Sequence, residues 1–183
     1  MKYLFNFLLI GVFAAMIACE PNNPFDTGPV YDVDGNLAID SVKIAAYLDT
    51  AQIDSIYRIH DPSGVVIIVQ EEGEGSRPTG GNIVRTDYTG LLMSDGSIFD
   101  TNNEIIARQN DLYVEGRTYN LFSFVVGAGN VITGWDIAYR RMRPGTKARL
   151  IIPSPYGYRD SESNSRIPAN SVLMFDVNFR GID

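Results

Sequence analysis

The sequence is poor in the residues around which many active sites are built. Its 183 residues include one cysteine and one histidine. A single cysteine cannot form an internal disulfide, so the fold must be stabilised by its core alone. A Ser/His/Asp triad would have to use His60, and no Cys/His cluster has the spacing of a zinc site. The sequence therefore predicts no metal site and no bound cofactor.

Basic residues are scarce as well. There are 15 Lys and Arg residues against 22 Asp and Glu residues, which gives a formal net charge of −7. Nucleic-acid binding needs a basic surface, and no run of Lys or Arg supplies one. Gly127-Ala128-Gly129 lacks the later glycine and the strand-to-helix context of a dinucleotide loop. We therefore expect no nucleic-acid partner and no nucleotide cofactor.

Long apolar runs are absent except near the start of the chain. The stretch from Leu4 to Ile17 is almost entirely apolar and follows Lys2. It is shorter than the roughly 20 residues that a transmembrane helix needs, and it lies where a signal peptide would lie. We therefore interpret residues 1–18 as a targeting signal.

The end of this signal resembles the processing site of bacterial lipoproteins. Met16-Ile17-Ala18-Cys19 is similar to a lipobox, which implies cleavage before Cys19 and acylation of that cysteine. The protein would then be exported and anchored by its lipid, at the outer membrane facing the periplasm or at the cell surface. A plain secretory signal, or an uncleaved anchor with an incidental cysteine, is the alternative.

Two segments of different character precede residue 64. Residues 19–37 are rich in Pro, Asn, Asp and Gly without apolar periodicity, which predicts a flexible tether. Residues 38–63 are interpreted as a helical appendage capped by Asp40 or Ser41. Further apolar residues follow at helical spacing at Ile53, Ile56 and Ile59. The appendage either packs on the main domain or joins two copies into a homodimer.

From residue 64 onward, β-rich runs alternate with Gly and Pro turns. The predicted strands are residues 65–69, 83–92, 119–126, 147–152 and 171–179. Residues 130–142 instead predict a helix, because Thr133 and Asp136 stand in capping-box relation. Its apolar face would comprise Trp135, Ala138, Tyr139 and Met142. The predicted fold is α+β, an antiparallel β-sheet wrapped around one short α-helix, with residues 64–183 as the main domain.

This region carries a series of short motifs: DYTG at 87–90, DGSIFD at 95–100, FSFVVG at 122–127, VITGW at 131–135, MRPG at 142–145, YGY at 156–158, IPANS at 167–171 and LMFDV at 173–177. The series resembles that of FKBP-type peptidyl-prolyl cis/trans isomerases. The motifs follow one another in the family's order from residue 64 to the C-terminus. The resemblance implies an isomerase that rotates X-Pro bonds in exported proteins and so assists their folding.

The resemblance also implies a pocket for the proline ring of a proline-containing polypeptide. Its catalytic residues would be Tyr88, Phe99, Asp100, Trp135, Tyr158 and Phe175. Its further substrate-binding residues would be Phe122, Val131, Ile132 and Ile167. Trp135 would form the floor, while the Ile132 backbone N–H and the Tyr158 hydroxyl would bind peptide carbonyls. Phe124 and Leu173 are expected in the core instead.

The sequence departs from the family's pattern around this pocket. Residues 101–121 form a long connection in which Arg108 and Arg117 are both candidates for the basic residue that follows the Phe-Asp pair. Asn130 stands where an acidic residue is common, and Arg166 stands where an apolar residue is common. These changes predict weak macrolide binding. They also leave open a non-catalytic, chaperone-like module that binds proline-containing segments, or a structural lipoprotein that reuses the fold.

Overall fold

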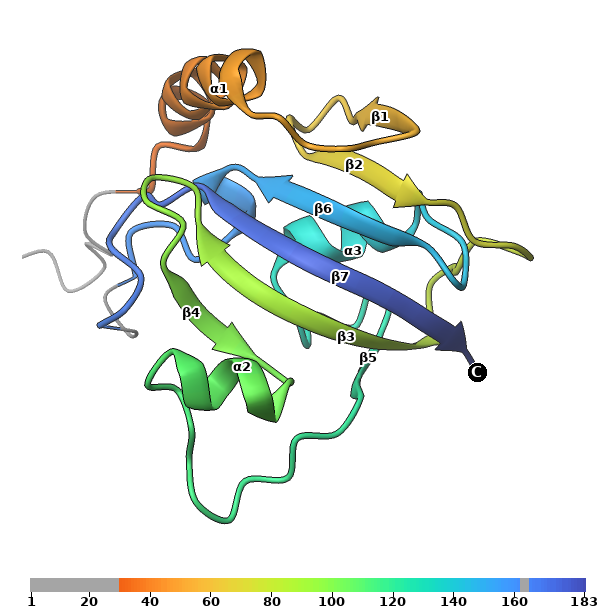
Figure 1. The fold of residues 1–183 in the computed structure, drawn as a ribbon. Helices are drawn as coiled ribbons and strands as arrows, with labels where there is room; N and C mark the ends of the chain where they lie inside the picture. Colours follow the sequence, from red (N-terminus) through yellow and green to blue (C-terminus); the bar gives the residue numbers. More distant parts are fainter. Residues whose placement is uncertain (1–29, 162–164) are drawn as a thin grey trace, which may run out of the picture. The chain divides into compact units, whose positions relative to one another are not determined.

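The computed structural model describes residues 30–161 and 165–183, in which one antiparallel sheet is covered by helices (Figure 1). The strands are β1 (Tyr57–His60), β2 (Val66–Glu71), β3 (Ile83–Leu92), β4 (Ile98–Thr101), β5 (Phe122–Val125), β6 (Lys147–Ile152) and β7 (Leu173–Ile182). Their order in the sheet is β1-β2-β6-β7-β3-β4, and β5 pairs with β3 outside this path. The strand pairs are antiparallel.

Three α-helices and one short 3-10 turn accompany the described part of the sheet. They are α1 (Val33–Thr50), α2 (Glu104–Gln109) and α3 (Thr133–Tyr139), with a short 3-10 turn, η1 (Ser154–Tyr156). In α3, Trp135 and Tyr139 are buried, as the predicted apolar face requires. Gly134 allows α3 to approach β6, because a Cβ there would lie 2.3 Å from the Ile152 Cγ2 atom. The predicted α+β fold, an antiparallel sheet around a short helix, is confirmed.

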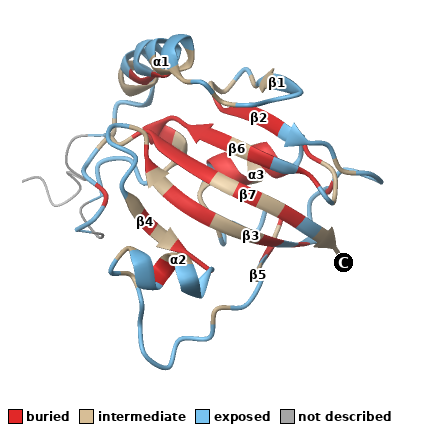
Figure 2. Ribbon diagram, viewed as in Figure 1, coloured by how far each residue is buried: buried red, intermediate tan, exposed pale blue. Residues whose placement is uncertain are grey.

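The sheet has an apolar core on each of its two faces. On β2, Ile67 and Val69 belong to the cluster around α3, whereas Val66 and Ile68 belong to the cluster that includes Ile44 of α1. Successive side chains of a strand point to opposite faces, so β2 is buried on both. This burial is visible along β2 and β6 in Figure 2. It explains why the predicted strand at 65–69 is continuously apolar rather than alternating.

Helix α1 differs from the prediction for this part of the chain. The helix begins at Val33, because the Asp32 carboxylate accepts a hydrogen bond from the Gly35 N–H at 2.9 Å. The prediction of a tether through residue 37 is therefore wrong for residues 33–37, and Asp40 is not a helix cap. Asp40 is only 1% exposed and accepts hydrogen bonds from the Ser154 N–H at 2.8 Å and hydroxyl at 2.6 Å. Residues 1–29, with the predicted signal, Cys19 and most of the tether, lie outside the described residues.

The helical spacing predicted after residue 50 is also wrong. Ile59 lies in β1, which pairs with β2 from Tyr57 opposite Val69 to His60 opposite Val66. The residue pattern of such a short edge strand is decided by its neighbour in the sheet rather than by its own periodicity. No described helix contains Ile53 or Ile56.

The predicted capping box of α3, formed by Thr133 and Asp136, is also wrong. The N-cap residue is Ile132, and it forms no side-chain capping bond. Asp136 instead accepts a hydrogen bond at 2.8 Å from the backbone N–H of Gly127, in the turn that precedes the helix. This carboxylate therefore fixes the turn between β5 and α3.

Candidate active site

A pocket of about 400 Å³ opens beside the start of α3. It is lined by Tyr88, Phe99, Asp100, Phe122, Gly129, Asn130, Val131, Ile132, Trp135, Tyr158 and Phe175. Every residue predicted for the proline pocket except Ile167 therefore lines it. Ile167 is 3% exposed and lies in the core cluster around α3, to which Trp135, Phe99 and Phe175 of the pocket also belong. Gly129 and Asn130 were not predicted as site residues, although they directly precede the VITGW motif.

Trp135 lies at the centre of the aromatic walls of this pocket. It is 4% exposed, and its ring centroid lies 5.3 Å from those of Tyr88 and Phe175 and 5.6 Å from that of Phe122. These three contacts are edge-to-face, the arrangement that aromatic quadrupoles favour. Among the described residues, none accepts a hydrogen bond from the buried Trp135 indole N–H. The pocket floor is thus a fixed apolar surface supplied by the first turn of α3.

A glycine on β3 allows two of the pocket walls to meet. Gly90 pairs with Phe175 of β7 on one side and with Asp100 of β4 on the other. A Cβ at Gly90 would lie 2.6 Å from the Phe99 Cζ atom and 2.9 Å from the Phe175 Cε1 atom. The rings of Phe99 and Phe175 pack edge to face at 5.5 Å over this position. The absence of a side chain at Gly90 is therefore what places both rings at the pocket.

One edge of the pocket carries a chain of polar contacts. The Tyr88 hydroxyl donates to the Asp100 carboxylate at 2.5 Å, and the Thr101 N–H donates to the other oxygen of that carboxylate at 2.9 Å. Arg117 lies 3.4 Å from Asp100, whereas Arg108 pairs with Glu104 at 2.7 Å. Of the two candidate arginines, Arg117 is therefore the one beside the Phe-Asp pair.

The tyrosines of the pocket are held in their protonated form. Burial raises the pKa of the Tyr88 hydroxyl, and its hydrogen bond to negatively charged Asp100 raises it further. Burial also raises the pKa of Tyr158, with a smaller contribution from the charge of Asp100. Both hydroxyls are therefore hydrogen-bond donors at neutral pH rather than bases or nucleophiles.

Two donors at the pocket are available to a ligand. Tyr158 is 40% exposed, and within the described residues its hydroxyl has no hydrogen-bond partner. The backbone N–H of Ile132 likewise donates to no group in the part of the chain that the structure describes. An extended peptide has carbonyl oxygens on both sides of a proline, and two separated donors suit such a ligand.

The described residues offer little for other kinds of chemistry at this position. Among them, no group of three His, Cys, Asp or Glu side chains is placed to bind a metal ion. His60 lies on β1 at the edge of the sheet and does not line the pocket. Phe124 and Leu173 are buried in the core, as predicted. The site is an apolar pocket with hydrogen-bond donors at its rim that can bind the carbonyls of a peptide.

Known proteins resemble the chain over the same region. The family model of the FKBP-type peptidyl-prolyl cis-trans isomerase matches residues 74–180. FK506-binding protein 1 of Dictyostelium discoideum is 32% identical over 114 residues, which cover 62% of this chain and 94% of that protein. FK506-binding protein 1B of Neurospora crassa is 34% identical over 125 residues, 65% of this chain and 98% of that protein.

Longer relatives match only in part. Peptidyl-prolyl cis-trans isomerase FKBP53 of Arabidopsis thaliana is 36% identical over 118 residues, 63% of this chain but only 22% of that protein. Among solved structures, FkpA from Escherichia coli superposes with a TM-score of 0.58 at 24% identity, covering 82% of this chain and 62% of that one. This last likeness concerns the fold, and it extends beyond the residues that the family model matches.

Proposed function

This chain belongs to the FKBP-type peptidyl-prolyl cis-trans isomerase family, and we propose that it catalyses rotation about X-Pro bonds of polypeptides in the pocket over Trp135. One observation carries the proposal: an apolar aromatic box of about 400 Å³ has hydrogen-bond donors for a peptide at its rim. The shape and polarity of this box suit a proline ring with its flanking carbonyls. No covalent chemistry is required, because the reaction breaks no bond.

The apolar walls favour the transition state of this rotation. The barrier is roughly 20 kcal/mol, because the amide loses its resonance as it twists. The twisted amide has less charge separation between nitrogen and carbonyl oxygen than the planar one. Transfer from water into a box built by Tyr88, Phe99 and Trp135 therefore stabilises the twisted amide relative to the planar one, which is differential binding of the transition state.

The polar groups of the site orient the substrate. We assign the Ile132 N–H and the Tyr158 hydroxyl as donors to peptide carbonyls. These hydrogen bonds would hold the substrate in conformations from which the X-Pro bond can rotate. Asp100 fixes the Tyr88 ring through their 2.5 Å hydrogen bond and is itself held by Arg117. These residues therefore keep one wall of the box rigid while the amide twists.

The test is the rate of isomerisation of a short X-Pro peptide, measured by exchange NMR with the full chain at catalytic concentration. Phe99→Leu removes an aromatic wall and should lower kcat/KM by about tenfold, which corresponds to about 1.4 kcal/mol of lost transition-state stabilisation. Phe179→Leu is the matched control, because Phe179 is fully buried but does not line the pocket. Equal activity of the two folded variants would contradict the assignment of the site.

The second candidate function is a chaperone-like module that binds proline-containing segments without accelerating their rotation. Asn130, which lines the pocket where an acidic residue is common in the family, supports this alternative. The same assay separates the two functions. Saturable binding of the peptide without any change in its exchange rate would favour the module over the enzyme.

We also propose that the domain is exported and attached to a membrane through an acylated Cys19, with cleavage after Ala18. The support is in the sequence alone: the apolar run from Leu4, the small residue before the cysteine, and the absence of any second cysteine. Mass spectrometry of the mature N-terminus tests this. Acyl chains on Cys19, absent from Cys19→Ser, are expected, and an unmodified Cys19 in the membrane-free fraction would contradict it.

A homodimer through the N-terminal appendage remains a proposal. On α1, Ile39 is 56% exposed and Val42 is 71% exposed, so the helix keeps apolar side chains available after packing on the sheet. Sedimentation of the full chain beside an Ile39→Glu, Val42→Glu double variant tests it. A concentration-dependent dimer should be weakened by the added charges, and a monomer at all concentrations would contradict the proposal.

A further inference from the structure

The long connection between β4 and β5 forms an ordered wall rather than a simple loop. The guanidinium of Arg108, in α2, lies 3.5 Å from the ring centroid of Tyr113. Tyr113 stacks on Tyr119 with ring centroids 5.9 Å apart and an interplanar angle of 11°. Arg117 lies 5.0 Å from the Tyr119 ring on the same connection. We refer to the β4–β5 connection with these four stacked side chains as the wall.

Asn102 ties both ends of the connection to the sheet. Its side-chain oxygen accepts a hydrogen bond from the Tyr88 N–H at 2.7 Å, and its amide donates to the Asn120 carbonyl at 3.0 Å. Asn102 is only 7% exposed, so these bonds are shielded from water. At the middle of the connection, the Val114 N–H donates to the Tyr119 hydroxyl at 3.0 Å. The wall therefore exists before any ligand binds.

A hollow of about 490 Å³ lies between this wall and the proline pocket. It is lined by Phe99, Asp100, Asp111, Leu112, Tyr113, Val114, Arg117, Tyr158 and Arg166. Phe99, Asp100 and Tyr158 line the proline pocket as well, so the two spaces adjoin at these residues. A polypeptide whose proline lies against Trp135 would reach the hollow by passing over them.

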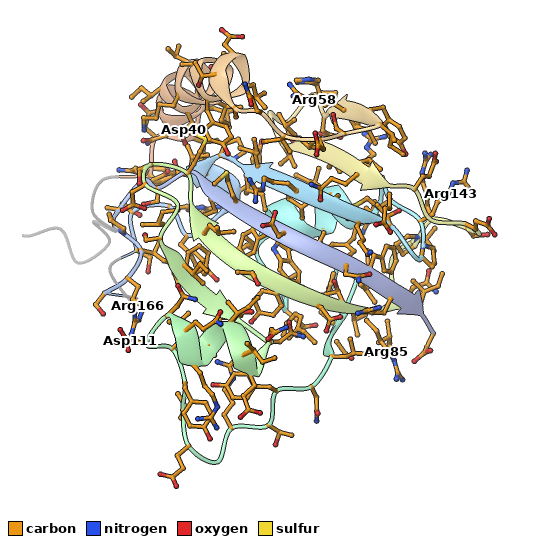
Figure 3. The ribbon with its side chains drawn as sticks, viewed as in Figure 1. Asp40, Arg58, Arg85, Asp111, Arg143 and Arg166 are labelled. Atoms are coloured by element: carbon orange, nitrogen blue, oxygen red, sulfur yellow. The ribbon has the colours of Figure 1, made fainter. Side chains whose placement is uncertain are left out.

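The hollow is closed on its far side by a contact between two loops. Arg166 donates to the backbone carbonyl of Asp111 at 3.0 Å, and both residues are labelled at the same corner of Figure 3. This contact joins the β4–β5 connection to the segment that carries Tyr158. The hollow therefore has walls from two separate parts of the chain and adjoins the proline pocket.

The lining of the hollow indicates which side chain would bind there. Among the described residues that line the hollow, Asp100 and Asp111 balance the formal charges of Arg117 and Arg166. Large apolar side chains are nevertheless left exposed around it: Tyr113 is 37% exposed, Val114 is 56% exposed and Tyr158 is 40% exposed. Burying this surface against an apolar side chain is favourable, whereas a charged side chain gains no unbalanced partner.

We propose that the hollow is a second substrate subsite, which binds a large apolar or aromatic side chain of the same polypeptide at a position outside the proline pocket. This inference rests on the proposed function, because it takes the ligand of the adjoining pocket to be a prolyl peptide. It assigns a role in substrate selection to the β4–β5 connection. The substrates preferred by this chain would then carry an apolar residue at a fixed distance from the proline.

The experiment uses the full chain and a set of X-Pro peptides in which Phe, Ser, Lys or Glu occupies each position from two to five residues on either side of the proline. At one position, replacing Ser by Phe should raise kcat/KM by about fivefold, mainly by lowering KM. Val114→Asp should abolish this preference and favour Lys there instead, while turnover of the short unextended peptide stays unchanged. Ile105→Asp is the matched control, because Ile105 is exposed on the same connection but does not line the hollow.

The outcomes separate the subsite from the proposed function. Equal Phe preferences in the parent and Val114→Asp proteins, or no preference at any position, would overturn the subsite while leaving the isomerase intact. A preference for Glu or Lys in the parent protein would also overturn it. If no peptide is isomerised, the affinities of the same peptides are compared, and a Phe preference that Val114→Asp removes would support the subsite without the enzyme.

Discussion

Replacing Asp40 should weaken the attachment of α1 to the rest of the domain. The Asp40 carboxylate accepts hydrogen bonds from the Ser154 N–H at 2.8 Å and hydroxyl at 2.6 Å, and Lys43 donates to its other oxygen at 3.0 Å. Asp40 is 1% exposed and Ser154 is fully buried, so water cannot replace the lost acceptor. In Asp40→Ala, two buried donors of Ser154 lose their partner. Tyr31 is the nearest substitute, with its hydroxyl 3.3 Å from the Ser154 hydroxyl.

The expected cost follows from these contacts. A buried donor left unsatisfied costs about 1–3 kcal/mol, and Tyr31 relieves one of the two, so Asp40→Ala should lower the free energy of unfolding by about 1–3 kcal/mol. The ion pair with Lys43 adds little, because Lys43 is half exposed. Asp40→Asn keeps one acceptor oxygen and should cost about half as much.

Urea unfolding of the full chain, followed by far-UV circular dichroism, measures this. Asp49→Ala is the matched control, because Asp49 is on the same helix but exposed, and it should change stability by less than about 0.5 kcal/mol. Because Ser154 begins the η1 turn that leads to Tyr158, we expect Asp40→Ala also to raise KM for prolyl peptides. If Asp40→Ala were as stable as Asp49→Ala, the buried contact between α1 and η1 would be refuted.

Two further predictions concern the pocket itself. Gly90→Ala should lower the free energy of unfolding by about 1–3 kcal/mol and should lower isomerase activity, because its Cβ would displace the Phe99 and Phe175 rings. Gly181→Ala is the control, because a Cβ there meets no neighbour within 4 Å. Equal activity of the two variants would contradict the packing argument. The isomerisation rate constant should be independent of pH between about 6 and 9, because the pKa of both Tyr88 and Tyr158 is raised above its ordinary value near 10. A rate profile with a clear step in that range would show that a titrating group takes part in catalysis.

Elements with a strong local pattern could be predicted from the sequence almost residue for residue. The predicted strands at 83–92 and 147–152 coincide with β3 and β6, because runs of β-branched and apolar residues bounded by Gly and Pro favour strands in any context. Helix α2 carried a local signal that the prediction overlooked. Asn103 precedes it and accepts hydrogen bonds from the Ile105 and Ile106 N–H groups, as an N-cap residue does.

Other features depend on contacts that no local pattern reveals. Strand β1 exists through its pairing with β2, and Asp40 is an acceptor for Ser154 that lies 114 positions away in the sequence. The pocket could be predicted because its residues belong to recognisable motifs, although Ile167, which is buried in the same core cluster as Trp135, is not among the lining residues. The hollow beside it could not, since Val114 and Arg166 come together only through the tertiary fold.

The central claim is that a proline ring binds against Trp135, and the fluorescence of this residue tests it most directly. Trp135 is the only tryptophan in the chain and lines the pocket, so its emission reports the occupancy of this site. Titration of the full chain with a prolyl peptide should give a saturable change in emission, and the same peptide with alanine in place of proline should give none. An unchanged emission under conditions where the peptide is isomerised would place catalysis elsewhere and contradict the account.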